Sequence, residues 1–317
     1  MTNKLQHAFG TRFRRIITNS ADGVPDWLPQ IESGDDFGLF KPSDAPWVVH
    51  GDLATLIGGI RALLMQALHP GSLAGVTDHS RYEQDPLGRL AGTTKWLSIL
   101  TFGSTQAIAA ESSRVNGMHK RVVGQYEVLP GQPKTYAAAD SDLLLWVHIA
   151  FTDSFLIAHE FYGAKKIPGG SDAYVSLWSK AVVPLGLDSA PQTRAELKQV
   201  IDSFDPVLRA DQKTLNVVRF IKKPPLSKAA RLAYAIMFQA AVITIEPKYR
   251  KILGLRNWPA WLVIPTAKLL LNGMRLALGG VSSGASHLSH GRHSRLGLRA
   301  VRRVLRGNCD SNSRNGG

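Results

Sequence analysis

The chain has 317 residues, enough for one large domain or two ordinary ones, and its composition, 44% apolar and 20% charged, is globular. Its single cysteine, Cys309, excludes a disulfide within the chain and indicates a reducing compartment. The net charge of +14 is typical of proteins that bind nucleic acid or anionic lipid. The sequence contains no RNA-binding aromatic motif, zinc-finger spacing or helix-turn-helix pattern, so we expect no nucleic-acid partner.

Helical periodicity runs through most of the chain. Residues 142–163 are apolar almost all round, which predicts a helix buried on most sides. Residues 125–139 contain two prolines and a glycine and are expected to form a loop, and residues 45–51 carry the only tempting strand pattern. These patterns predict a single all-α domain. The expected helices fall within residues 54–70, 89–103, 105–124, 142–163, 167–187, 190–204, 211–221, 227–245 and 259–278.

Two segments near the C-terminus raise the question of a membrane. Residues 258–280 are apolar but are interrupted by Pro265, Lys268, Asn272 and Arg275, which favours a buried or interfacial helix over a membrane span. Residues 292–306 carry six arginines and no acidic residue, with apolar residues largely on one helical face. They predict either a basic amphipathic helix on a membrane or partner, or a solvated terminal helix. We expect a cytoplasmic protein. Peripheral association with the inner membrane surface is a further expectation that rests on the basic segment.

Ten histidines are the main candidates for chemistry, at positions 7, 50, 69, 79, 119, 148, 159, 287, 290 and 293. His148 and His159 lie about 16 Å apart along one helix and cannot share a metal ion. The tail histidines 287, 290 and 293 are expected to bind metal only adventitiously. On a helix, His119 is flanked by Val115 and Val122, and a neutral imidazole in an apolar groove is what axial haem ligation requires. A hydrogen-bonded structural histidine is the alternative at each of these positions.

Three long strings occur in a recognisable order: residues 61–94 (RALLMQALHPGSLAGVTDHSRYEQDPLGRLAGTT), 102–124 (FGSTQAIAAESSRVNGMHKRVVG) and 136–163 (YAAADSDLLLWVHIAFTDSFLIAHEFYG). In this order they resemble the MpaB-type oxygenase family, which includes the bacterial rubber oxygenases. The resemblance covers about residues 45–280. It leaves an N-terminal segment, 1–44, expected to be partly flexible, and a C-terminal part, 281–317, expected to hold the basic helix and a disordered tail.

The resemblance implies an all-α fold with a globin-like core that holds one haem b, and therefore iron, through a histidine. The string RVNGMHKRV places this axial role on His119, and His69 and His148 are the next candidates for cofactor binding. Arg89 and Thr93 match an arginine and a threonine on the distal side of the rubber enzyme. Arg89 then either donates to bound oxygen or pairs with a haem propionate, and the sequence leaves both roles open. Gly92 stands where the rubber enzyme has a lysine that can close the iron site.

The expected function is that of a haem-dependent oxygenase that uses O2 on a hydrophobic, lipid-like or isoprenoid-like substrate. Two other classes remain open at this stage. One is a non-catalytic protein that binds or senses haem. The other is a haem-free helical protein that binds a lipid or a protein partner and whose histidines are structural.

Overall fold

The computed structural model describes residues 26–34, 36–79, 85–129 and 131–277. Within these ranges it has thirteen α-helices, three short 3₁₀ helices and one two-stranded hairpin, so the predicted all-α class is confirmed. The expected globin-like arrangement stays a prediction. The helices are α2 (Leu28–Glu32), α3 (Ala45–His50), α4 (Ala54–Gln66), α5 (Pro70–His79), α6 (Pro86–Phe102), α7 (Thr105–His119), α8 (Ser141–Tyr162), α9 (Gly170–Trp178), α10 (Arg194–Ser203), α11 (Gln212–Lys222), α12 (Lys228–Thr244), α13 (Pro247–Ile252) and α14 (Ala260–Ala277).

The pair α4 and α8 forms the centre of the fold. Both helices are rich in leucine, isoleucine and aromatic residues, and α8 is buried along most of its length, as its sequence predicts. The two backbones approach closely at Gly58, where a Cβ atom would lie 2.6 Å from the Phe155 ring. The Trp146 indole also crosses to α4, where its N–H donates to the carbonyl of Gln66 at 3.3 Å. These contacts fix the core on which the other helices pack.

A buried ion pair also joins α4 to α8. Arg61 lies in α4 with only 2% of its side chain exposed, and its Nη2 is 2.6 Å from a carboxylate oxygen of Asp153. Its Nη1 donates to the hydroxyl of Ser154 at 2.8 Å. An arginine held this deeply must keep its carboxylate partner, because an unpaired buried charge is very costly.

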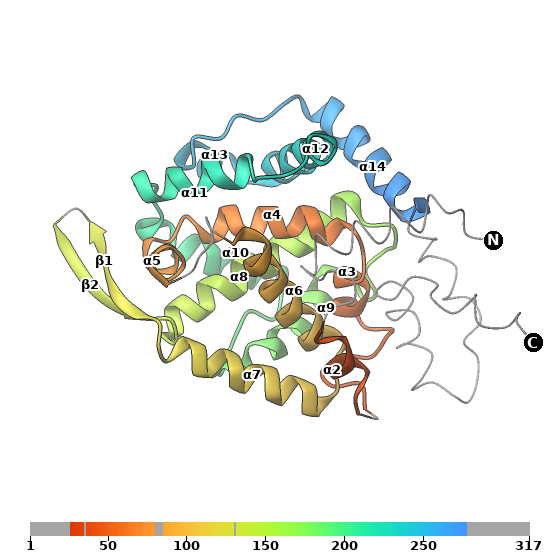
Figure 1. Ribbon diagram of the computed structural model, residues 1–317, viewed down its shortest axis with the longest axis horizontal. Helices are drawn as coiled ribbons and strands as arrows, with labels where there is room; N and C mark the ends of the chain where they lie inside the picture. The colour runs from red at the N-terminus through yellow and green to blue at the C-terminus, as the bar shows by residue number, and fades with distance from the viewer. Residues whose placement is uncertain (1–25, 35, 80–84, 130, 278–317) are drawn as a thin grey trace, which may run out of the picture.

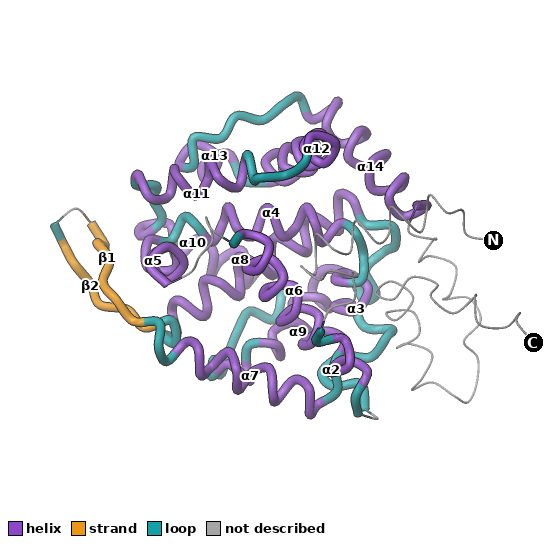
Figure 2. Tube along the Cα trace, in the orientation of Figure 1, coloured by secondary structure: helices purple, strands orange, loops and turns teal. Residues whose placement is uncertain are grey.

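Two groups of helices lie on opposite sides of this centre. In Figures 1 and 2, α11, α12, α13 and α14 lie along one side of α4, and α2, α3, α6, α7 and α9 lie on the other. Helix α12 packs directly on α4, and α14 packs on α12. The outer side of α14 therefore faces away from the core. The hairpin of β1 (Val123–Leu129) and β2 (Gln132–Ala137) projects at one end, beside α5.

Several sequence expectations are wrong in detail. The segment expected as a loop forms the β1–β2 hairpin, whose turn includes Gly131 in the left-handed region at φ +78°. Helix α7 ends at His119, not at Gly124, because the chain leaves it to enter β1. Residues 45–50 are helical rather than extended. The expected basic helix at 292–306, the tail histidines and Cys309 lie outside the described residues.

Helix α8 is the one helix in the described part of the chain that is long and apolar enough to cross a membrane. About 67% of its apolar window is buried inside the protein, and α4 covers one of its sides. A core helix has these same properties, so its apolar character is explained by packing.

Candidate functional site

Helices α6 and α7 carry the residues to which the resemblance assigns chemistry. The Asp85 side chain caps α6 by accepting from the N–H of Gly88, and the Ser104 hydroxyl caps α7 by accepting from the N–H of Ala107. Only Gly103 and Ser104 separate the two helices. In the view of Figure 1 the two helices run apart from this short turn.

A charged group joins the two helices partway along. Glu111 of α7 is buried and lies 3.4 Å from the Lys95 ammonium of α6, and it accepts two hydrogen bonds from Arg114. The Glu111 carboxylate is therefore fully compensated, and it fixes how α6 and α7 meet. Arg89 and His119 both lie beyond this bridge, away from the turn.

The predicted distal residues occupy the first two turns of α6. Arg89 and Thr93 are four residues apart and so lie on one face of the helix. Thr93 is half-buried; the Arg89 side chain lies outside the described part of the structure. Between them, a Cβ atom built on Gly92 would meet no other atom within 4 Å. Helix geometry therefore puts positions 89 and 93 on the same face of α6.

His119 is the last residue of α7 and is half-buried. Its ring nitrogen Nδ1 is buried and has no hydrogen-bond partner among the described residues. Burial lowers the pKa of the imidazole below its usual value, so the ring is neutral at pH 7. One turn earlier, the Asn116 amide donates to the carbonyl of Pro184 at 3.0 Å, which holds this end of α7 in place. A fixed, neutral and unpaired imidazole is available as a ligand.

Three more buried polar atoms without partners lie on the same group of helices. They are Nε1 of Trp96 in α6, Oγ of Ser112 in α7 and Nε1 of Trp178 in α9. The Trp96 and Trp178 rings are 6.2 Å apart, and Ser112 precedes His119 by two turns on one helical face. Most buried polar groups in folded proteins are hydrogen-bonded, so each of these unpaired groups requires an explanation. Bound ligand or water is the ordinary one.

The other buried histidines have structural partners. His50 bonds Thr101 through Nδ1 and Tyr174 through Nε2, both at 2.8 Å. His69 precedes α5, and its Nδ1 accepts from the backbone N–H groups of Gly71 and Ser72, so it acts as a helix cap. His148 is buried in α8, with Nε2 3.5 Å from the hydroxyl of Thr152. Among His69, His119 and His148, His119 has the least engaged ring.

His79 and His159 make hydrogen bonds to backbone carbonyls. His79 is the last residue of α5, and its Nε2 lies 3.0 Å from the carbonyl of Val123. His159 Nε2 lies 2.8 Å from the carbonyl of Lys165. Both contacts join separate elements of the fold.

Comparison with known families decides the chain's affiliation. The family described as "ER-bound oxygenase mpaB/B'/Rubber oxygenase, catalytic domain" matches residues 47–277, well over half of the chain. The chain belongs to this family. The match includes Arg89, Thr93 and His119, and it ends with helix α14. No curated protein matches, and no solved structure matches.

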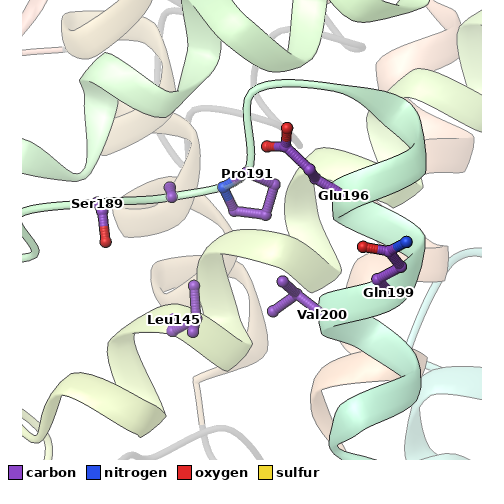
Figure 3. Close-up of a pocket in the computed structure, with 7 residues that line it drawn as sticks. Leu145, Ser189, Pro191, Glu196, Gln199 and Val200 are labelled. Carbon is purple, nitrogen blue, oxygen red and sulfur yellow. The ribbon is translucent and has the colours of Figure 1, made fainter.

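A pocket lies elsewhere on this mpaB/rubber-oxygenase family member. It has a volume of about 250 Å³ and is lined by Leu145 of α8, the loop 189–191, and Glu196, Gln199 and Val200 of α10 (Figure 3). None of the predicted site residues lines it, and it offers one carboxylate and no imidazole. This pocket therefore includes none of the residues to which the resemblance assigns chemistry.

The three unpaired polar groups of α6, α7 and α9 were not predicted from the sequence. The sequence gives no functional signal at Trp96, Ser112 and Trp178, because a buried indole or hydroxyl normally has a hydrogen-bond partner. Their distinguishing property is the missing hydrogen bond, which depends on packing between separate helices. The one signal in the sequence is that Ser112 and His119 are seven residues apart, which puts both on the same face of a helix.

The buried histidines predict a marked sensitivity to acid. Burial lowers the pKa of His50 to about 3 and those of His69 and His148 to about 4, below the value of 6.5 expected when unfolded. The unfolded chain therefore binds more protons as the pH falls from 6.5 towards 4, and the fold loses stability in that window. At pH 5.5 the three groups together lower the free energy of unfolding by about 4 kcal/mol relative to pH 7.5. Urea unfolding at the two pH values measures this difference.

The variant His69→Asn serves as a control for this prediction. Asparagine also caps helices but does not titrate, so the loss between pH 7.5 and 5.5 should be smaller by about 1.4 kcal/mol. Equal urea midpoints at the two pH values in the wild-type protein would contradict the prediction.

Proposed function

We propose that this member of the mpaB/rubber-oxygenase family is a haem b-dependent oxygenase that acts on a hydrophobic substrate. The observation that carries the proposal is the His119 imidazole, which is neutral, half-buried and without a hydrogen-bond partner at Nδ1. An imidazole in this condition is a competent ligand for iron.

The chemistry of the donor set fits a haem. The described residues contain no cluster of three or more histidine, cysteine, aspartate or glutamate side chains that suits a bare metal ion. A haem brings four nitrogen ligands of its own and needs a side-chain ligand from the protein, which His119 would provide. The unpaired groups of Trp96, Ser112 and Trp178 give polar contacts for a ligand edge or bound water in a largely apolar setting.

The side chains of this protein then have separate tasks. His119 holds the cofactor, and when bound the haem iron supplies the activation of O2 for attack on a carbon–carbon double bond or C–H bond. Arg89 donates hydrogen bonds, either toward the oxygen-binding side or to a propionate. The Thr93 hydroxyl orders a water molecule or passes a proton. The Trp96 and Trp178 rings keep the surroundings apolar and limit access of water.

Reconstitution with haem tests this proposal. The purified protein, mixed with haem and freed of excess, should show a Soret band, and it should consume O2 when supplied with a long-chain unsaturated lipid or polyisoprenoid. A Soret band without O2 consumption or product favours a non-catalytic haem-binding protein. A preparation incubated with haem that shows no Soret band rejects haem binding altogether.

Whether α6 would face the bound iron can be tested at Gly92. The site at this position is open, because a Cβ atom there would meet nothing within 4 Å. Gly92→Lys adds an amine to α6 within one turn of positions 89 and 93, and we expect it to bind the iron and shift the haem spectrum to a six-coordinate, low-spin form. Gly117→Lys, at another open glycine on α7, is the matched control and should leave the spectrum unchanged. Identical spectra for Gly92→Lys and the wild type would place α6 away from the iron.

A further inference from the structure

Positive charge is concentrated in one layer of the molecule. Residues 212–277, which include α11 to α14, contain twelve lysines and arginines and one acidic residue, Glu246. Residues 1–211 contain nineteen basic and twenty-two acidic residues, so the rest of the described fold is slightly acidic. The net charge of +14 therefore comes largely from this layer, together with the arginine-rich sequence that follows it.

Most of these cations have no acidic partner. Lys213, Lys248 and Arg275 form ion pairs with carboxylates of the neighbouring helices and loops. The other nine form no ion pair within the described ranges, and all of them except Arg250 are exposed. These nine are Arg219, Lys222, Lys223, Lys228, Arg231, Arg250, Lys251, Arg256 and Lys268. An anionic partner would neutralise charge that the fold itself leaves uncompensated.

The same layer exposes large apolar side chains. Along α14, Trp261, Leu269 and Leu276 are 78%, 74% and 72% exposed, and their spacing places them on one side of the helix. The opposite side of α14, which includes Leu271, is buried against the fold. Six of the eleven exposed large apolar side chains of the described structure belong to α12, to α14 or to the turn before α14. They are Leu232, Trp258, Trp261, Leu262, Leu269 and Leu276.

We propose that the outward surface of α12 and α14 docks this protein on an anionic lipid bilayer. An in-plane helix with tryptophan and leucine on its free side and cations around it is the arrangement that binds the boundary between headgroups and acyl chains. Lys268 lies within the apolar stripe, and its long aliphatic chain lets the ammonium reach a lipid phosphate while Leu269 enters the acyl region. Helix α14 lies on the bilayer rather than across it, because one side of it is committed to the protein core.

The charge and the apolar stripe together favour lipid over other anionic partners. A polyanion that binds by charge alone would leave Trp261 and Leu269 in water. Binding is stabilised by these two side chains only when they are removed from water. Beyond α14, the sequence contains six more arginines within residues 292–306, which add to the positive charge of the chain. Docking does not depend on the proposed haem chemistry, although a membrane is where hydrophobic substrates dissolve.

Flotation with lipid vesicles tests the proposal on the full chain. The protein should float with vesicles of equimolar phosphatidylcholine and phosphatidylglycerol, and only weakly with phosphatidylcholine alone, and high salt should weaken the binding. The double variant Trp261→Ser, Leu269→Ser removes two apolar side chains that would enter the bilayer. It should lower the partition coefficient between vesicles and water more than about tenfold. Lys268→Glu should also weaken binding to anionic vesicles.

Matched variants on other surfaces serve as controls. Val123→Thr, at an exposed position of β1, and Lys180→Glu, at an exposed position after α9, should bind vesicles like the wild type. The proposal is overturned by failure of the wild type to float with anionic vesicles. It is also overturned if Trp261→Ser, Leu269→Ser floats normally, which would assign binding to another segment. Self-association that these two changes abolish, without vesicle binding, would make the surface a contact between copies of the chain.

Discussion

Asp153→Ala should cost the fold about 3–5 kcal/mol, because it leaves the Arg61 guanidinium buried without its carboxylate. The two side chains are 2% and 18% exposed, and the N–O distance of 2.6 Å indicates direct contact. The hydroxyl of Ser154 and the carbonyl of Thr244 keep two hydrogen bonds to Arg61, but neither provides negative charge. Since small domains are typically stable by only 5–15 kcal/mol, this single change should bring the protein close to unfolding. Urea unfolding followed by circular dichroism measures the loss.

Two further variants test whether the loss of stability comes from the unpaired buried charge of Arg61. Asp142→Ala removes an exposed carboxylate of the same helix, 3.6 Å from Lys134, and should cost less than about 1 kcal/mol. Combining Arg61→Met with Asp153→Leu replaces the pair by apolar groups and should restore much of the stability lost in Asp153→Ala. If Asp153→Ala is no less stable than Asp142→Ala, the buried pair does not hold α4 to α8 in solution.

The central helices could be predicted from sequence because their signals are local. The apolar run of residues 142–163 forms α8, which is buried along most of its length, as expected. The β1–β2 hairpin was missed because it has little apolar alternation: in β2 only Tyr136 is fully buried. Pro70 was interpreted as the end of a helix, whereas it opens α5 at a position where its missing N–H costs nothing.

The candidate site was predictable only in part, for a different reason. Arg89, Thr93 and His119 follow from the order of long motifs, and helix geometry places the first two on one face. The structural roles of His50 and His69 depend on tertiary contacts: His50 bonds Tyr174, which lies 124 residues further along the chain. Local spacing cannot reveal which imidazole is already satisfied and which one is free to bind a ligand.

This difference among the histidines leads to the second large expected effect. His119→Ala should lower haem affinity more than about tenfold and remove the Soret band of the ligated protein, because the change deletes the proposed axial nitrogen. The apo-protein should unfold within about 1 kcal/mol of the wild type, since Nδ1 of His119 bonds no other group and no hydrogen bond is lost. A structural histidine would give the opposite result, with stability lost and the haem spectrum retained.

Comparison with His148→Gln and His69→Asn makes the assignment decisive. His148 is wholly enclosed in α8 and His69 caps α5, so these changes should lower stability while leaving the haem spectrum in place. Added imidazole should partly restore the spectrum of His119→Ala by entering the space that the side chain occupied. A full Soret band in His119→Ala without imidazole would transfer the axial role to His69 or His148. In that case the unpaired ring of His119, with Trp96 and Ser112, would mark a binding site for substrate rather than for the cofactor.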